Sequence, residues 1–396
     1  MIKRELYMSR IRPFMGQPIV KVLTGIRRCG KSVMLQLIQD ELTENGVDPA
    51  VFLVVNFESL ALDYVRSSAT CYQYIRTFAA SHSGTIYLFL DEIQELDGWE
   101  KMINSCLIDF DCDIYLTGSN AKLLSGELAT YLAGRYVEFR IYPFSLQEVK
   151  LMLPGQSDSE LFQLYLKRGG LPFLYQFPMN HENARQYLGD IYDSIVLKDI
   201  ITRHHIRDTE QFKRVLLYFI SNVGNTFSAS SIIRYMKSEQ RSLSTETLYN
   251  YIDYCKEACL FHTAPRQDLA GKKLLKFQEK IYLTDHGIRE AIYGNNLRDI
   301  NQTLENIVYM ELLRRGYEVF IGKNNAVEVD FVAKKGSQTE YYQVAYLLAS
   351  EETVQREFGA FHGINDNYPK YVLSLDEMDF SQNGYQHHNL RTFLLS

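Results

Sequence analysis

The chain has 396 residues, of which 46% are hydrophobic and 23% are charged, and this balance excludes a disordered or fibrous protein. The length predicts two or three domains, and the net charge of −6 argues against a general nucleic-acid coat protein. No apolar stretch is long enough to span a membrane and no apolar secretory segment begins the chain, so we expect a cytoplasmic protein with no membrane partner. The six cysteines form no CxxC pair, and Cys255 and Cys259 fit core packing better than a zinc site.

A glycine-rich loop is the strongest motif. Residues 25–32 match GxxxxGK[ST], after a segment that predicts a strand (19–23) and before one that predicts a helix (33–38). In this setting backbone N–H groups surround phosphates and the start of the helix adds partial positive charge. We expect Lys31 to reach the β- and γ-phosphates of ATP and Ser32 to hold Mg²⁺. The candidate nucleotide contacts are Gly25, Ile26, Arg27, Arg28, Cys29, Gly30, Lys31, Ser32 and Val33, although loop arginines can also face solvent or pair with carboxylates.

Acidic and polar residues follow two further predicted strands. The apolar run 86–90 leads into Asp91 and Glu92, which predicts a second ligand for Mg²⁺ in Asp91 and a general base in Glu92. The run 113–117 leads to Ser119 and Asn120, either of which can orient the attacking water or contact the γ-phosphate. Arg135 is the candidate arginine finger, acting in cis or across a subunit boundary, with a structural ion pair as the alternative.

These motifs together resemble those of bacterial and archaeal AAA-type P-loop ATPases, near the STAND and origin-recognition groups. The resemblance is carried by segments 12–14, 25–32, 90–99, 116–120, 133–135 and 142–148. It implies an α/β fold, namely an αβα sandwich around a parallel sheet, with the glycine loop at the carboxyl ends of the strands. It also implies ATP binding and Mg²⁺-dependent hydrolysis.

Four segments are expected along the chain. Residues 1–150 are expected to form the ATPase core. Helical periodicity interrupted at 169–172 predicts a helical segment over 151–207, and the family resemblance implies that this segment is a lid. Residues 208–295 have the pattern of a winged helix, with three helices and two strands around Gly271. Residues 296–396 resemble a restriction-endonuclease-like α/β domain.

The charges of the expected winged helix leave DNA binding open. Its third helix, over 243–258, carries mostly acidic residues and tyrosines, with Asn250 as the one candidate for base recognition. The wing is basic, with a net charge of +3 from Arg266, Lys272, Lys273, Lys276 and Lys280 against Asp268 and Glu279. It can follow phosphates, or it can be a solvated hairpin or a surface that packs on another subunit.

The last segment resembles the PD-(D/E)xK nuclease fold, with Glu305 on a helix and with Asp330 and Gln343 on strands. Active members have a lysine two positions after the second acidic or amide residue, where this chain has Ala345. Lys334 and Lys335 are alternative sources of that charge, but a polar hairpin tip explains them more simply. With eight Lys and Arg against thirteen Asp and Glu over 300–396, we expect an inactive domain.

Two functions remain open for the whole chain. The first is an ATPase that couples hydrolysis to remodelling associated with nucleic acid. The second is a nucleotide-gated switch or scaffold for protein partners, including a second copy of the chain. An ATP-coupled nuclease is a third hypothesis, and the missing lysine opposes it.

Overall fold

The computed structural model describes residues 2–60, 65, 67–120, 132, 134–269, 271, 273–294, 299–324 and 327–396, with the side chains of 273–278 excepted. The chain forms two compact units, one of residues 1–143 with 257–259 and one of residues 144–256 with 260–396. The expected ends of the core at 150 and of the winged helix at 295 both fall inside the second unit. No helix of the described residues is long and apolar enough to cross a membrane. All six cysteines are free and buried.

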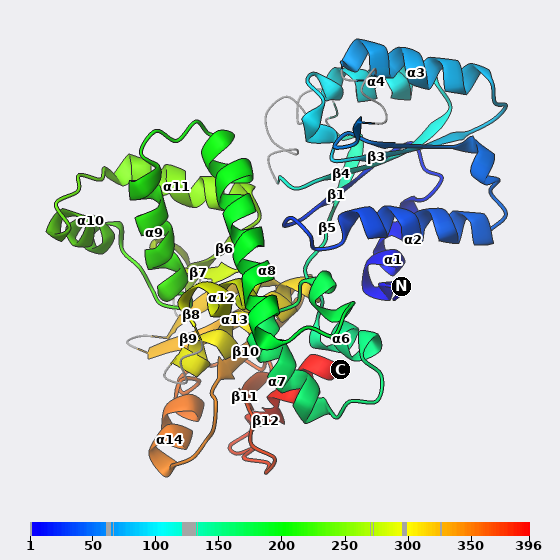
Figure 1. The fold of residues 1–396 in the computed structure, drawn as a ribbon. Helices are drawn as coiled ribbons and strands as arrows, with labels where there is room; N and C mark the ends of the chain where they lie inside the picture. Colours follow the sequence, from blue (N-terminus) through cyan, green and yellow to red (C-terminus); the bar gives the residue numbers. More distant parts are fainter. Residues whose placement is uncertain are drawn as a thin grey trace. The chain divides into compact units, whose positions relative to one another are not determined.

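The first unit is a parallel sheet between helices (Figure 1). Its sheet has the order β2-β3-β4-β1-β5, and α3 and α4 cover one face while α1 and α2 lie on the other. This arrangement confirms the predicted αβα sandwich. The elements are α1 (Glu5–Ile11), η1 (Arg12–Phe14), β1 (Val20–Thr24), α2 (Lys31–Glu44), η2 (Pro49–Val51), β2 (Phe52–Asn56), α3 (Ser68–Ala80), β3 (Ile86–Asp91), η4 (Ile93–Glu95), α4 (Trp99–Asp109), β4 (Cys112–Gly118) and β5 (Tyr136–Arg140).

Alternation along the strands builds the core of this unit. Val20 and Val22 of β1 and Leu88 and Leu90 of β3 are fully buried in one apolar cluster with α3 and α4. The registers align the carboxyl ends of the strands, with Thr24 opposite Gly118 and Asn56 opposite Asp91. Residues that follow different strands are thereby brought to one edge of the sheet.

The second unit combines helices with a seven-stranded mixed sheet of order β12-β11-β10-β9-β8-β6-β7. Strand β6 pairs with β7 antiparallel and with β8 parallel, so strands on both sides of residue 295 share one sheet. The helices are α6 (Leu146–Met152), α7 (Asp158–Arg168), η6 (Pro172–Tyr175), α8 (His181–Ser194), the π-helix η7 (Ile195–Thr202), α9 (Thr209–Ser221), α10 (Ala229–Ser238), α11 (Thr245–Glu257), α12 (His286–Tyr293), α13 (Ile300–Arg314), α14 (Glu351–Gly359) and α15 (Leu390–Leu395). The strands are β6 (Phe261–Asp268), β7 (Lys273–Leu283), β8 (Glu318–Asn324), β9 (Val327–Lys335), β10 (Gln338–Val344), β11 (Lys370–Ser374) and β12 (Gln386–Asn389).

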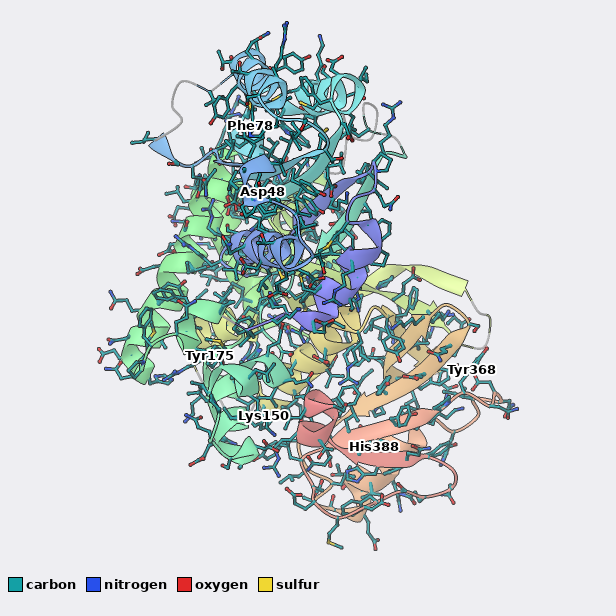
Figure 2. All side chains as sticks on the ribbon, turned by 90° about the vertical axis from the view of Figure 1, so that its right-hand side faces the viewer. Asp48, Phe78, Lys150, Tyr175, Tyr368 and His388 are labelled. Carbon is teal, nitrogen blue, oxygen red and sulfur yellow. The ribbon has the colours of Figure 1, made fainter. Side chains whose placement is uncertain are left out.

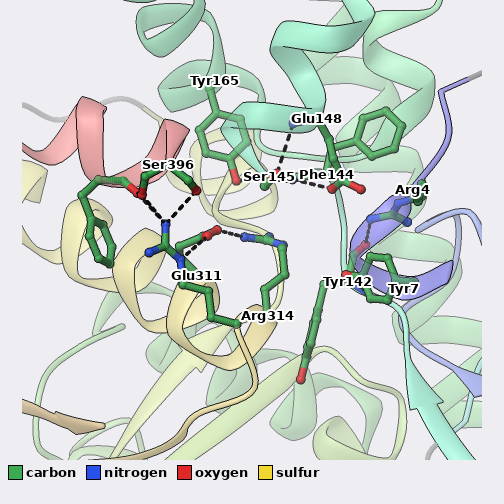
Figure 3. Close-up of polar contacts among 12 residues, drawn as sticks. Arg4, Tyr7, Tyr142, Phe144, Ser145, Glu148, Tyr165, Glu311, Arg314 and Ser396 are labelled. Carbon is green, nitrogen blue, oxygen red and sulfur yellow. Dashed lines mark hydrogen bonds and ion pairs between the residues drawn. The ribbon is translucent and has the colours of Figure 1, made fainter. Parts of the chain in front are cut away.

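Side-chain hydrogen bonds stabilise the ends of several of these helices. Ser145 and Glu148 form a capping box at the start of α6, and Glu311 of α13 accepts a hydrogen bond from Arg314 (Figure 3). Asp285 caps α12 through the N–H of Gly287 at 2.8 Å and also accepts the N–H of Gly170 at 2.7 Å. A Cβ at Gly287 would lie 2.2 Å from the carbonyl oxygen of Arg168, so a glycine is required where α7 ends against α12.

Candidate nucleotide-binding site

The glycine loop connects β1 to α2 and needs both of its glycines. Gly25 has a φ of 148°, and a Cβ there would lie 2.2 Å from the carbonyl oxygen of Ile141. Gly30 has a φ of 102°, a conformation that L side chains rarely adopt. The chain therefore turns sharply on both sides of the loop before α2 begins.

The start of α2 is free of any side-chain cap, because Gly30 occupies the N-cap position. The side chain of Lys31 is buried there, with Nζ 3.2 Å from the carbonyl oxygen of Gly25 and 3.6 Å from Glu92 Oε1. Uncapped N–H groups at a helix start, together with a buried ammonium group, form an anion-binding arrangement.

The rest of the loop divides into buried and exposed positions. Ile26 and Cys29 are fully buried, and burial raises the pKa of the Cys29 thiol above its ordinary value. Arg28 is exposed and Val33 is 39% exposed. Arg27 Nη1 lies 3.4 Å from Glu58 Oε1. This loop arginine therefore pairs with a carboxylate, which was one of the alternatives that the sequence left open.

Arg4 is a positioning residue that the motif analysis missed. Its buried guanidinium donates to the carbonyl oxygen of Cys29 at 3.1 Å. It also donates to the carbonyl oxygen of Tyr142 at 2.8 Å (Figure 3). The N–H of Tyr142 in turn donates to the Tyr7 hydroxyl at 3.1 Å. Helix α1 thus fastens the glycine loop through contacts that no local sequence pattern signals.

Asp91, at the end of β3, is buried among neutral donors. Its carboxylate accepts hydrogen bonds from the hydroxyls of Ser32 and Thr117 and from Asn56 Nδ2 at 2.9 Å. Burial raises the pKa of Asp91 above its ordinary value, and the hydrogen bonds from Thr117 and Ser32 oppose this shift. Asn56 and Thr117 were not among the predicted site residues, but their positions near the ends of β2 and β4 are the signal that could have identified them.

Glu92 has a left-handed backbone, with a φ of 55°. Its N–H donates to Thr117 Oγ1 at 2.9 Å, and its Oε2 accepts from Gln94 Nε2 at 2.5 Å. Such a conformation costs on the order of 1–3 kcal/mol in a non-glycine residue and is concentrated at functional sites. The side chains of Glu92, Lys31, Ser32 and Asp91 are connected by these contacts at one edge of the sheet.

Ser119 and Asn120 follow the end of β4, which lies between β1 and β3 in the sheet. Both are buried, and the Ser119 hydroxyl has no hydrogen-bond partner among the described residues. Leaving a buried hydroxyl without a partner is costly, and each such group requires an explanation.

Arg135 is not brought to this edge of the sheet. It immediately precedes β5, and its carbonyl accepts the N–H of Val20 at the start of β1. Because Thr24 pairs with Arg140 at the other end of β5, five residues, or about 16 Å of strand, separate Arg135 from the loop edge. Its guanidinium instead donates to Asn104 Oδ1 at 3.3 Å. This position favours an action across a subunit boundary over an action in cis on the loop of the same chain.

A second polar cluster lies in the other unit, around the residues predicted from the nuclease resemblance. The N–H of Asp330 donates to Gln343 Oε1 at 2.7 Å, and Lys280 Nζ lies 2.8 Å from both Glu305 and Glu328. Burial raises the pKa of Asp330 well above its ordinary value, and the charge of Glu305 adds to the shift.

A lysine from β7, and neither Lys334 nor Lys335, supplies the positive charge of this cluster. Lys334 lies over the Phe320 ring and Lys335 donates to the carbonyl oxygen of Arg315. Ala345 is buried. No group of three His, Cys, Asp or Glu side chains in the described part of the chain is placed to hold a metal ion.

Two of the five basic residues of the predicted wing form ion pairs within the second unit, and three have side chains outside the described residues. Arg266 pairs with Glu328 at 3.2 Å, and Lys280 belongs to the cluster above. Lys272 and the side chains of Lys273 and Lys276 lie outside the described residues.

Comparison with known proteins agrees with the geometry of the glycine loop. Residues 17–150 match a family model described as an AAA domain, and residues 159–299 match a domain of unknown function, DUF8612. An uncharacterized protein of Haemophilus influenzae is 38% identical over 94% of this chain and 93% of its own length. The chain belongs to the AAA-type P-loop ATPases.

Other matches to this AAA protein are more distant. The uncharacterized protein MJ1544 of Methanocaldococcus jannaschii is 28% identical over 93% of this chain and 83% of its own length. The structure of the Aeropyrum pernix ORC1 protein in complex with DNA aligns with 74% of this chain and 92% of that chain, at 13% identity and a TM-score of 0.35.

Proposed function

We propose that this protein binds ATP with Mg²⁺ at the glycine loop and hydrolyses it, with Glu92 as the general base. The observation that carries the proposal is the meeting of Lys31, Ser32, Asp91 and Glu92 at the uncapped start of α2. Lys31 would bind the β- and γ-phosphates through its ammonium group. Residues 25–33 would surround the phosphates through their backbone N–H groups.

The residues around Asp91 fit a magnesium ion. The hydrogen-bond donors to this buried carboxylate among the described residues are hydroxyl and amide groups, so its hard oxygen atoms suit a divalent cation. Mg²⁺ in phosphate-transfer sites is held by one or two protein ligands, waters and the phosphates, so Ser32 and Asp91 suffice. The ion would neutralise negative charge on the phosphates.

Three polar residues support the proposed hydrolysis. Thr117 binds the Asp91 carboxylate and the backbone N–H of Glu92, and so fixes that carboxylate relative to the Glu92 backbone. Glu92 would accept a proton from the attacking water. Ser119 or Asn120, which follow the end of β4, would orient that water or contact the γ-phosphate.

Arg135 is proposed to act on a neighbouring copy of the chain. Arg135→Ala should lower kcat by about 10³-fold with little change in ATP affinity, because an arginine finger stabilises charge that develops in the transition state. Mixing Arg135→Ala with Lys31→Ala protein should restore part of the phosphate release, since one partner keeps the loop and the other keeps Arg135. The matched control is Arg76→Ala, another exposed arginine of this unit. Full activity of Arg135→Ala would assign Arg135 a structural role.

The target of hydrolysis is proposed to be nucleic acid, with a protein partner as the second candidate. Residues 208–295 have the element order of a winged helix in α9, α10, α11, β6 and β7, and this order supports the first candidate. The acidic exposed residues of α11 and the internal ion pairs of Arg266 and Lys280 favour the second.

Steady-state phosphate release tests the function and separates the two targets. Release should require Mg²⁺ and stop on addition of EDTA. If nucleic acid is the target, DNA should raise the rate several-fold at low salt, and the increase should fall as salt rises. A slow rate that is indifferent to DNA would favour the protein-partner switch, and no release with Mg²⁺ would contradict the ATPase proposal.

Whether the DNA recovered from these reactions has been cut tests for nuclease activity in the second unit. We propose that its nuclease-like cluster is inactive, because the Lys280 ammonium lies between Glu305 and Glu328 and occupies the position that a divalent cation would need. The recovered DNA should be uncut, whereas Mg²⁺-dependent nicking that Asp330→Ala abolishes would contradict this.

A further inference from the structure

The two carboxylate oxygens of Glu92 have different partners. Oε1 lies 3.6 Å from Lys31 Nζ, at the start of α2 where the phosphates would bind, and Oε2 accepts a hydrogen bond from Gln94 Nε2. A general base must be oriented as well as present, because a small displacement of a reacting group costs much of the rate. Since Gln94 holds Oε2, the oxygen on the side of the phosphates is Oε1.

Hydrogen-bond chemistry decides which end of the Gln94 amide faces Glu92. An ionised carboxylate only accepts hydrogen bonds, so the NH₂ group of the amide is the end that can pair with it. A hydrogen bond to an ionised acceptor is also stronger than one between neutral groups. The bond from Gln94 is therefore a strong and directional restraint on the Glu92 carboxylate.

The other end of the Gln94 amide makes the presence of a glutamine here unusual. Its Oε1 is buried and has no hydrogen-bond partner among the described residues. A methionine side chain of similar volume would fill this place without the cost of a buried, unpaired oxygen. Packing alone thus gives no reason for an amide at this position, whereas the hydrogen bond to Glu92 does.

A short, anchored turn carries Gln94. The left-handed backbone of Glu92 turns the chain directly into η4. Ile93 and Leu96 are buried in the apolar cluster of α3 and α4, against which Phe78 of α3 also packs (Figure 2). Because the residues before and after Gln94 are fixed by this packing, the turn can hold the amide in one place beside Glu92.

We propose that Gln94 is a positioning residue for the general base, and that its Nε2–H group holds Glu92 so that Oε1 faces the water that attacks the γ-phosphate. The inference rests on the proposed hydrolysis at Glu92 and adds to it the residue that orients this base. In this role Gln94 contacts neither the nucleotide nor the water and acts only through Glu92.

The test is single-turnover hydrolysis of ATP with Mg²⁺ by the full chain and by its Gln94→Met variant. The rate constant should fall about 10- to 100-fold, as expected when a side chain that orients a reacting group is removed. ATP affinity should change less than about 3-fold, because the interaction that is lost acts on the chemical step. Tm should change by less than about 3 °C, because the lost hydrogen bond is offset by removal of a buried, unpaired oxygen.

A double variant separates positioning from a structural role. Adding Gln94→Met to Glu92→Gln should leave the residual rate within about 2-fold of that of Glu92→Gln alone, because no base is left for Gln94 to orient. A structural role of Gln94 would instead lower the rate in both backgrounds.

Gln36→Met is the matched control, since Gln36 donates to Asp40 at 2.9 Å on the exposed face of α2 and the variant removes the same kind of bond outside the site. It should hydrolyse ATP at the natural rate.

Three results would overturn the positioning role while the ATPase proposal stands: normal turnover of Gln94→Met, a loss of ATP affinity as large as the loss of rate, or a further loss of rate in the double variant. Normal turnover of Glu92→Gln would instead contradict the choice of base, and this inference with it.

Discussion

Lys31→Ala should weaken ATP binding at least about 100-fold, because a charge-assisted hydrogen bond contributes on the order of 1.5–3 kcal/mol and this ammonium would serve two phosphates. The side chain is buried at the start of α2, and its Nζ lies 3.2 Å and 3.4 Å from the carbonyl oxygens of Gly25 and Ile26. Phosphate release should fall to background. Equilibrium titration with a fluorescent ATP analogue measures the affinity directly.

The matched control for this variant is Arg28→Ala, which removes an exposed positive charge from the same loop. It should change the affinity less than about 3-fold, because exposed charges are screened by water and salt. Thermal unfolding of both variants separates a binding defect from a folding defect. If Lys31→Ala binds ATP as tightly as the natural chain and remains folded, the assignment of the loop is wrong.

Glu92→Gln should lower kcat by about 10²–10⁴-fold while ATP still binds, because an amide cannot accept the proton of the attacking water. Gln has nearly the same shape and can keep the left-handed backbone and the N–H bond to Thr117. The loss should therefore appear in single-turnover hydrolysis and leave the affinity near that of the natural chain. Loss of the negative charge beside Lys31 can even tighten binding.

Glu95→Gln serves as the control for Glu92→Gln, since it removes an exposed carboxylate three residues further along. It should hydrolyse ATP at close to the normal rate. A Glu92→Gln protein with normal turnover would show that another group activates the water. Loss of binding together with turnover would instead give Glu92 a structural role at the loop.

The glycine loop and the acidic pair could be predicted because each is a contiguous motif with a strand beside it. Gly25 and Gly30 are required by backbone geometry, and the apolar run before Asp91 is long enough for one buried strand. Parallel strands align their carboxyl ends, so the meeting of Lys31 with Asp91 and Glu92 follows once both strands are identified. The same reasoning predicted the position of Ser119 and Asn120.

Contacts between distant segments were not predictable from such patterns. Arg4 binds the carbonyl of Cys29 from a helix that carries no motif, and Asn56 reaches Asp91 only because β2 pairs with β3. The sequence left Arg135 open to action in cis, to action across a subunit boundary or to a structural ion pair, and only the pairing of β5 with β1 shows that it lies at the edge away from the loop.

In the second unit, too, the elements could be predicted from local patterns and the contacts between distant segments could not. The alternation at 327–332 and the helix around Glu305 are local signals, and both elements are present as β9 and α13. The source of the compensating lysine is not local: Lys280 reaches Glu305 and Glu328 because β6 joins β8 and carries β7 into the same sheet. The sequence by itself determined which residue types lie in the glycine loop and at the strand ends, since backbone turns and strand ends follow from neighbouring residues. Only the tertiary structure decided which side chains surround them, because strand order is set by packing across the whole sheet.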